Sequence, residues 1–91
     1  MNILKYDIVH SPFLISYKWS IEMPAGARIL DVQMQDKKPV MWALVDTERE
    51  YEMRAFVVVG TGWDVPSGYE YVATWQDVNY VWHLFEDNKN G

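Results

Sequence analysis

The stretch 57–68, VVVGTGWDVPSG, joins an apolar β-branched run to a glycine pair that is followed directly by a tryptophan. Backbone N–H groups of a glycine-rich loop can bind phosphate, usually at the start of a helix and often with a lysine nearby. No helical pattern follows here, the next lysine comes only near the C-terminus, and the spacing fits neither the P-loop nor the dinucleotide-binding motif. We therefore expect Gly60, Thr61 and Gly62 to form a chain reversal in which glycine supplies positive φ angles. The alternative is a binding loop with Trp63 as its anchor.

The two histidines, His10 and His83, are the next candidates for chemistry. A metal site needs several converging ligands, and two distant histidines without any cysteine support one only weakly. A nucleophilic triad needs a serine or threonine beside the histidine and a carboxylate beyond it, and no nucleophile-elbow pattern is present. We expect His83 to be packed or hydrogen-bonded on a strand, and we expect no metal ion and no cofactor.

Arg54 interrupts the apolar approach to the valine run and, in a strand, lies on the same face as Glu52. Its planar guanidinium donates bidentately, so it could anchor a carboxylate or a phosphate if that face lines a cavity. The alternative is a solvent-facing arginine paired with Glu52 or with an acid on a neighbouring strand.

Aromatic and acidic side chains are the remaining candidates for binding. Aromatic faces beside an arginine can stack a nucleobase, although filling the core or a dimer seam is the more common role. The acidic side chains form either a solvated rim or a surface that mimics nucleic acid toward a basic partner. The tryptophans are Trp19, Trp42, Trp63, Trp75 and Trp82, and the acids of the rim are Glu48, Glu50, Glu52, Glu70, Asp77 and Glu86.

Composition and charge limit the classes of protein to which the chain can belong. The chain has 91 residues, which fits one domain, and its formal net charge of −5 argues against general binding to nucleic acid. There is no cysteine, hence no disulfide framework and no thiolate metal site. The start, MNILKYDIVH, has Asp7 within its apolar stretch and does not resemble a signal peptide, and no apolar run is long enough to span a bilayer. A soluble protein of the cytoplasm is the expectation.

Most of the chain alternates apolar and polar residues with a period of two, which indicates strands with one face toward a core. The stretch 40–45, VMWALV, is apolar on both faces and is expected to be a central strand covered on both sides, or a strand whose second face meets another subunit. Because the gaps between strands are short, we expect antiparallel pairing in an up-and-down order. The predicted fold is all-β, a small antiparallel sandwich or partly open barrel of about seven strands. The expected strands are 3–9, 17–23, 30–35, 40–45, 50–59, 69–75 and 78–86, with a tight reversal at Gln76-Asp77.

The expected domain spans 1–86, with a flexible tail at 87–91. For residues 10–16 a loop, a bend and an edge strand remain open.

An ordered set of motifs, IEMPAGA, WALVD, GTG and VWHLFE, resembles a family of small uncharacterised proteins of bacteriophages and prophages. The resemblance runs from about Ile21 to Glu86. Such proteins often have histidine and then Ile-Pro after the Gly-Thr-Gly, whereas this chain has Trp63 and then Val65-Pro66. The resemblance implies a phage setting and supports the β fold, and it supplies no catalytic residue.

These observations lead to the hypothesis of a non-enzymatic phage protein that acts in the host cytoplasm, as a counter-defence or host-takeover factor. It would bind a host protein or sequester a small nucleotide-like signalling molecule. The candidate binding residues are Arg54, Gly60, Thr61, Gly62, Trp63 and His83. The alternatives are a minor structural or assembly protein that forms oligomers and, less favoured, a small hydrolase using His83.

Overall fold

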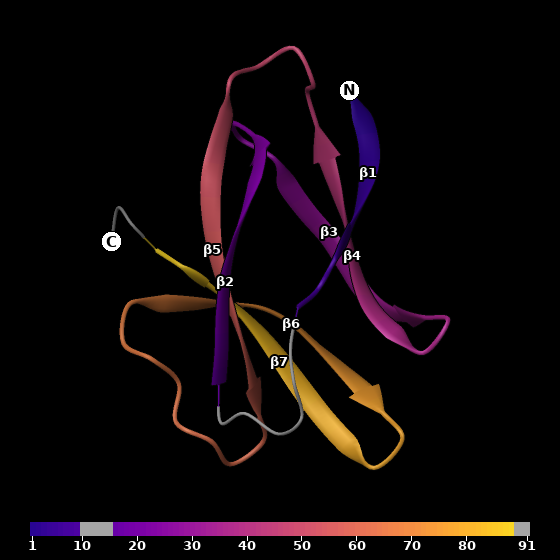
Figure 1. The fold of residues 1–91 in the computed structure, drawn as a ribbon, viewed down its shortest axis with the longest axis vertical. Coiled ribbons are helices and arrows are strands. Elements are labelled where there is room, and N and C mark those ends of the chain that lie inside the picture. Colours follow the sequence, from indigo (N-terminus) through magenta and orange to yellow (C-terminus); the bar gives the residue numbers. More distant parts are fainter. Residues whose placement is uncertain (10–15, 89–91) are drawn as a thin grey trace.

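The structure, a computed structural model, describes residues 1–9 and 16–88. It confirms the all-β class: seven strands and no helix occur in this part of the chain (Figure 1). The strands are β1 (Asn2–Asp7), β2 (Ser16–Pro24), β3 (Arg28–Gln35), β4 (Lys38–Val45), β5 (Tyr51–Gly60), β6 (Tyr69–Asp77) and β7 (Tyr80–Asp87). Ser16 thus begins a strand, while residues 10–15, including His10, lie outside the described residues.

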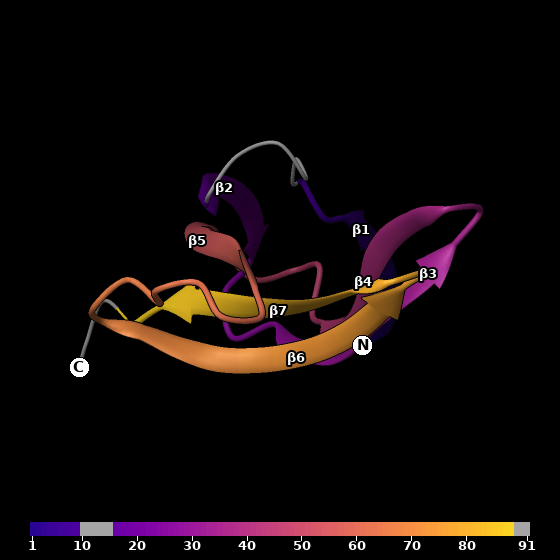
Figure 2. The ribbon, with the colours of Figure 1, turned by 90° about the horizontal axis from the view of Figure 1, so that it is seen from below.

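The strands form two antiparallel sheets, one in the order β1-β4-β3 and the other in the order β2-β5-β7-β6. Figure 2 shows the larger sheet curling from β6 at the bottom up to β2 at the top. The edge strands β3 and β6 pack against each other where the two sheets meet. The arrangement is sandwich-like and is not a closed barrel.

The expected up-and-down order is wrong, because only β3–β4 and β6–β7 are neighbours both in sequence and in a sheet. A short connection can also pass from one sheet to the other, and two of them do so side by side. The turn after β2 and the turn before β5 are joined by the Ala25 N–H, which donates to the Glu50 carbonyl at 2.7 Å. Gly26, at φ 77°, fits there because a Cβ would lie 2.8 Å from the Arg49 guanidinium.

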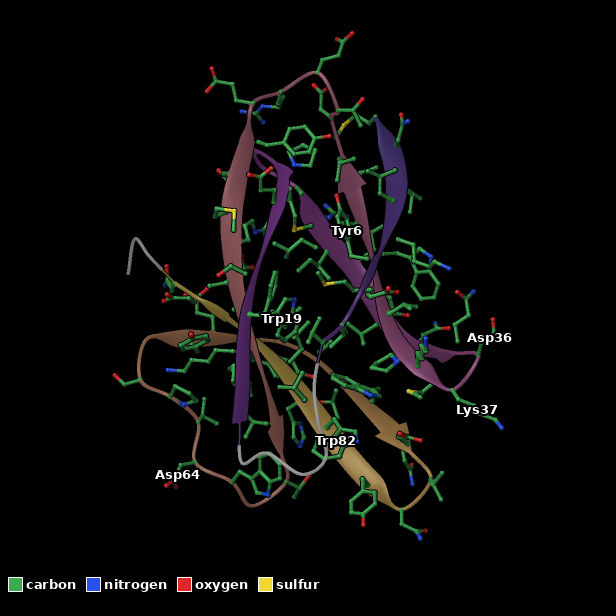
Figure 3. All side chains as sticks on the ribbon, viewed as in Figure 1. Tyr6, Trp19, Asp36, Lys37, Asp64 and Trp82 are labelled. Carbon is green, nitrogen blue, oxygen red and sulfur yellow. The ribbon has the colours of Figure 1, made fainter. Side chains whose placement is uncertain are left out.

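The core lies between the sheets and confirms the assignment of 40–45 to a central strand. Met41, Ala43 and Val45 of β4 are fully buried and face the larger sheet, with Phe56 of β5 among the largest side chains they meet. Figure 3 shows Tyr6 and Trp19 directed between the sheets, whereas the tip of the β3–β4 hairpin projects away. The buried core consists of Ile8, Met23, Ala27, Val32, Met41, Ala43, Val45, Phe56, Val58, Trp75, Trp82 and Leu84.

The two hairpin turns require unusual backbone angles. Asp36 and Lys37 both have positive φ, 51° and 68°, as a two-residue turn of the type I′ kind demands. The reversal expected at Gln76-Asp77 occurs two residues later, where Val78 has φ 54° and is 81% exposed. A left-handed conformation is rare for a β-branched residue, which is why sequence pattern did not indicate a turn there.

The last strand, β7, ends one residue later than the expected strand 78–86. Asp87 belongs to β7, and the N–H of Asn88 donates to the Gly68 carbonyl at 2.8 Å. Residues 89–91 lie outside the described part of the chain.

Candidate functional site

The Gly-Thr-Gly stretch forms a tight turn that closes over the end of β5. The N–H of Trp63 donates to the Gly60 carbonyl at 3.1 Å, and Gly62 has φ 90°, as a type II turn needs at its third position. Thr61 N–H donates to the Val81 carbonyl at 3.3 Å. Two of the backbone donors that a phosphate cradle would use are therefore engaged within the protein.

Trp63 folds back on this turn and is half-buried, packed against the core cluster. Its ring makes an edge contact with Trp82, with centroids 5.6 Å apart. A Cβ on Gly60 would lie 2.9 Å from the indole, although Gly60 itself does not have a positive φ. Gly62 thus serves the turn, as expected, whereas Gly60 is needed for the close packing of Trp63.

His83 lies in a chain of hydrogen bonds that crosses three segments. Its Nε2 is 2.9 Å from Thr61 Oγ1, its Nδ1 is 2.9 Å from Thr74 Oγ1, and Thr74 Oγ1 is 2.9 Å from the Tyr71 hydroxyl. A threonine thus stands beside the histidine, but a second threonine takes the place where a triad has its carboxylate. A hydroxyl has no negative charge, so Thr74 does not supply the electrostatic role that the carboxylate has in a triad. These hydrogen bonds connect the Gly60–Gly62 turn to β6 and β7.

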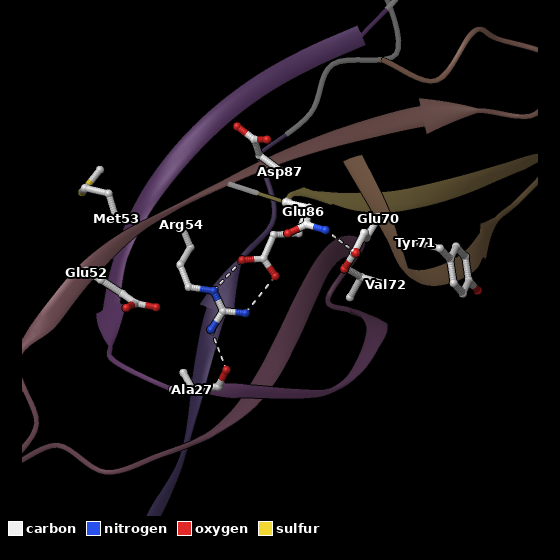
Figure 4. A pocket seen from close by; sticks show the side chains of 11 residues that line it. Ala27, Glu52, Met53, Arg54, Glu70, Tyr71, Val72, Glu86 and Asp87 are labelled. Carbon is white, nitrogen blue, oxygen red and sulfur yellow. Dashed lines mark hydrogen bonds and ion pairs between the residues drawn. The ribbon is translucent and has the colours of Figure 1, made fainter. Parts of the chain in front are cut away.

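Arg54 is engaged in an ion pair with Glu86 (Figure 4). Its Nε and Nη2 donate to the two carboxylate oxygens at 2.5 and 2.8 Å, and Nη1 donates to the Ala27 carbonyl at 2.5 Å. The side chains are only 15% and 22% exposed. The hydrogen bond to Glu86 raises the pKa of the Arg54 guanidinium further above its ordinary value. The acid on a neighbouring strand, one of the two partners considered for this arginine, is therefore the observed one.

A hollow of about 670 Å³ opens beside this ion pair, between the turn after β2, the strand β5 and the ends of β6 and β7. Acids dominate its charged lining, since Arg54 is the one basic residue and already binds Glu86. Met53 and Tyr71 also border the hollow, but their exposed side chains are directed away from the Arg54–Glu86 pair (Figure 4). The carboxylates of the hollow belong to Glu52, Glu70, Glu86 and Asp87.

The structure separates the sequence-predicted site residues into two groups. Gly60, Thr61, Gly62, Trp63 and His83 lie together at one end of β5. Arg54 is six residues earlier on the same strand, which at about 3.3 Å per residue places it roughly 20 Å away. The two groups therefore do not form one pocket.

Sequence reasoning missed Thr74 and Tyr71 as partners of His83 and treated Glu86 only as part of a solvated rim. Thr74 lies opposite His83 through the pairing of β6 with β7, and Glu86 lies opposite Phe56 through the pairing of β5 with β7. A correct prediction of β7 as a strand between β5 and β6 would have brought these residues together.

Among residues 1–9 and 16–88, no three histidine, cysteine or acidic side chains are placed to hold a metal ion. Nor does this part contain a helix that is long and apolar enough to cross a membrane.

The fold and these features define a small all-β protein with two antiparallel sheets and an acidic hollow at the margin of its core. The chain belongs to a protein family described as a domain of unknown function (DUF7352), whose model matches residues 1–91. It matches no curated protein and no solved structure.

Proposed function

We propose that this protein is a non-enzymatic binding protein and that its acidic hollow binds a basic side chain of a protein partner. The observation that carries the proposal is the charge of the hollow. Glu52, Glu70 and Glu86 line the hollow around a single cation, Arg54, whose guanidinium is occupied by Glu86 and Ala27, and Asp87 lies at its margin. A lysine or arginine of a partner would find carboxylate acceptors there.

The same charges favour a protein partner over a nucleotide. Phosphate binding relies on uncommitted cations or on converging backbone N–H groups. Arg54 is committed to Glu86, and the N–H groups of Thr61 and Trp63 are committed to Val81 and Gly60. Carboxylates around the hollow would also repel a phosphate.

Two exposed residues next to the hollow, whose side chains are directed away from the Arg54–Glu86 pair, are of the kind found in protein interfaces and would contact the part of a partner that lies outside the hollow. Tyr71 is 61% exposed, and its ring rests edge-on against Phe85 while its hydroxyl binds Thr74. An aromatic ring held in this way offers contact area with little loss of side-chain entropy. Met53 adds an adaptable apolar contact.

A binding role also fits the environment of His83 better than catalysis does. Thr61 and His83 are at hydrogen-bond distance, but neither lines the acidic hollow, and the group beyond the imidazole is Thr74. The resemblance to phage and prophage proteins supplies the biological setting of the proposal. In that setting the protein acts in the host cytoplasm, as a counter-defence or host-takeover factor.

The test is affinity purification of the tagged protein from infected host cells, followed by binding measurements on the recovered partner. Glu52→Lys/Glu70→Lys reverses two exposed charges of the hollow, and Glu48→Lys/Glu50→Lys makes the same change in net charge away from it. We expect the first variant to lose the partner and the second to keep it, with affinity falling as salt rises. Equal loss in both variants would refute the assignment to the hollow.

Two further measurements separate the other hypotheses. A rise in melting temperature with an anionic nucleotide would favour a nucleotide-binding protein instead. Detection of the protein in purified virions by mass spectrometry would favour the structural or assembly role.

A further inference from the structure

The two sheets have four edge strands, and they are not equally protected. β3 and β6 pack against each other, and each is interrupted by an irregularity, between Ile29 and Asp31 and between Tyr71 and Ala73. Bulges, and packing against another element, are common ways in which proteins prevent an edge strand from pairing with another chain. β2, in contrast, pairs with β5 without interruption from Ser16 to Pro24, and no strand among the described residues pairs with its other edge.

The accessible part of β2 is residues 18–22. Lys18, Ser20 and Glu22 are exposed, and Trp19 and Ile21, which face the core, are half-buried. Met23 and Pro24, by contrast, are buried. Among the β2 residues whose burial the structure describes, the accessible stretch is thus 18–22, with Ser20 at its middle.

This stretch is complementary to itself. If two copies of β2 pair antiparallel about a two-fold axis at Ser20, Lys18 of each copy lies opposite Glu22 of the other. On the inner face, Trp19 lies opposite Ile21. A shift by one residue in either direction removes both charge pairs, so the charges select a single register.

We propose that the exposed edge of β2 is a self-association surface, through which two copies form a symmetric dimer. Pairing about Ser20 joins the two larger sheets into one continuous sheet of eight strands, four from each copy. Lys18 lies with its Nζ 5.6 Å from the centre of the Tyr69 ring. Tyr69 belongs to β6, at the far edge of the same sheet, so the Lys18 side chain leaves this cation–π contact when it turns to the carboxylate of the second copy. An exposed cation–π contact is weak, so its loss is a small cost against a charge-assisted hydrogen bond.

The other uninterrupted edge, β1, does not offer the same match. An axis at Tyr6 would pair Lys5 with Asp7, but the next pair would join Leu4 to Ile8. Ile8 lies beyond the end of β1 and is buried. A five-residue edge is also smaller than a standard stable interface of roughly 800 Å² per partner, so the β2 dimer is expected to be weak and concentration-dependent.

The experiment is sedimentation analysis of the purified protein from micromolar to millimolar concentration. The mass is expected to rise from that of one chain, 10.7 kDa, toward that of two. In a dimer of Lys18→Glu, the new glutamate at position 18 of each copy lies opposite Glu22 of the other copy. In a dimer of Glu22→Lys, the new lysine at position 22 of each copy lies opposite Lys18 of the other copy. Each variant alone is expected to dimerise about tenfold more weakly or worse, since like charges directly opposite destabilise a strand pair.

The equimolar mixture of Lys18→Glu with Glu22→Lys is the decisive sample, because the mixed dimer regains opposite charges at both pairs. We expect it to dimerise at least as strongly as the unmodified protein. The control is a mixture of Lys18→Glu with Lys18→Glu/Glu48→Lys/Glu50→Lys, which has the same difference in net charge but places a glutamate opposite Glu22 at every pair, so no pair is restored. Glu48 is exposed in the turn before β5. Glu50, like Glu48, is exposed and lies outside the accessible stretch of β2. Circular dichroism of each variant verifies that the fold is retained.

Three outcomes would overturn the proposal: a protein that stays monomeric at millimolar concentration, single variants that dimerise as well as the unmodified chain, or a control mixture that dimerises as strongly as the decisive one. The proposal does not depend on the binding role of the acidic hollow, so failure of one leaves the other in place.

Discussion

Removing one partner of the Arg54–Glu86 ion pair is expected to destabilise the fold. The guanidinium joins β5 to β7 through Glu86 and to the turn after β2 through the Ala27 carbonyl. In Glu86→Gln the side chain keeps its size, but the amide offers one acceptor oxygen and no charge. Arg54 would then remain largely buried without a carboxylate.

The magnitude follows from the burial of the pair. Breaking a fully buried ion pair by removing one partner costs about 3–5 kcal/mol, whereas exposed pairs contribute about 0–1 kcal/mol. Arg54 and Glu86 are 15% and 22% exposed, between these limits. We therefore expect Glu86→Gln to lower the free energy of unfolding by about 2 kcal/mol. For a chain of this size that corresponds to a fall in Tm of about 8–16 °C.

Urea unfolding followed by tryptophan fluorescence measures this change, and a constant m-value would show that the denatured state is unaffected. The double variant Arg54→Met/Glu86→Leu serves as the control, because replacing both charges with apolar side chains leaves no buried charge unpaired. It should lose less stability than Glu86→Gln. A loss below about 0.5 kcal/mol in Glu86→Gln would refute the reasoning, since the pair would then behave as a screened surface contact.

Three other predictions concern the turns and the tyrosines. Gly60→Ala should destabilise by about 1–2 kcal/mol because its Cβ meets the Trp63 indole, and the cost should shrink in a Trp63→Ala background, measured by a double-mutant cycle. Val78→Gly should raise the free energy of unfolding by about 1 kcal/mol in urea, since glycine relieves the left-handed strain at an exposed site; a loss would contradict that strain. Burial raises the pKa of Tyr6 and of Tyr69 above the usual value of 10.0, so the unfolded chain releases these protons first and stability falls as pH rises past about 10. Absorbance at alkaline pH should show late-ionising tyrosines, and Tyr6→Phe should remove one of them.

Local pattern was enough to predict the strands. Alternation of apolar and polar residues indicated most of the seven, because a period of two follows directly from the geometry of an extended chain. The doubly apolar run 40–45 indicated a central strand for a similar reason, since both of its faces need cover. Gly62 was also predictable, because a type II turn demands a positive φ that glycine adopts at little cost.

Tertiary structure alone decided which strands pair, and the side-chain environments followed from that. A short connection predicts a hairpin only if both strands join the same sheet, and here two connections cross between sheets instead. Glu86 reaches Arg54 from 32 residues away, and Thr61 and Thr74 reach His83 from different segments. Side chains brought together by long-range pairing leave no periodic trace in the sequence. The sequence therefore allowed an acid on a neighbouring strand as the partner of Arg54, but only the pairing of β5 with β7 identified that acid as Glu86.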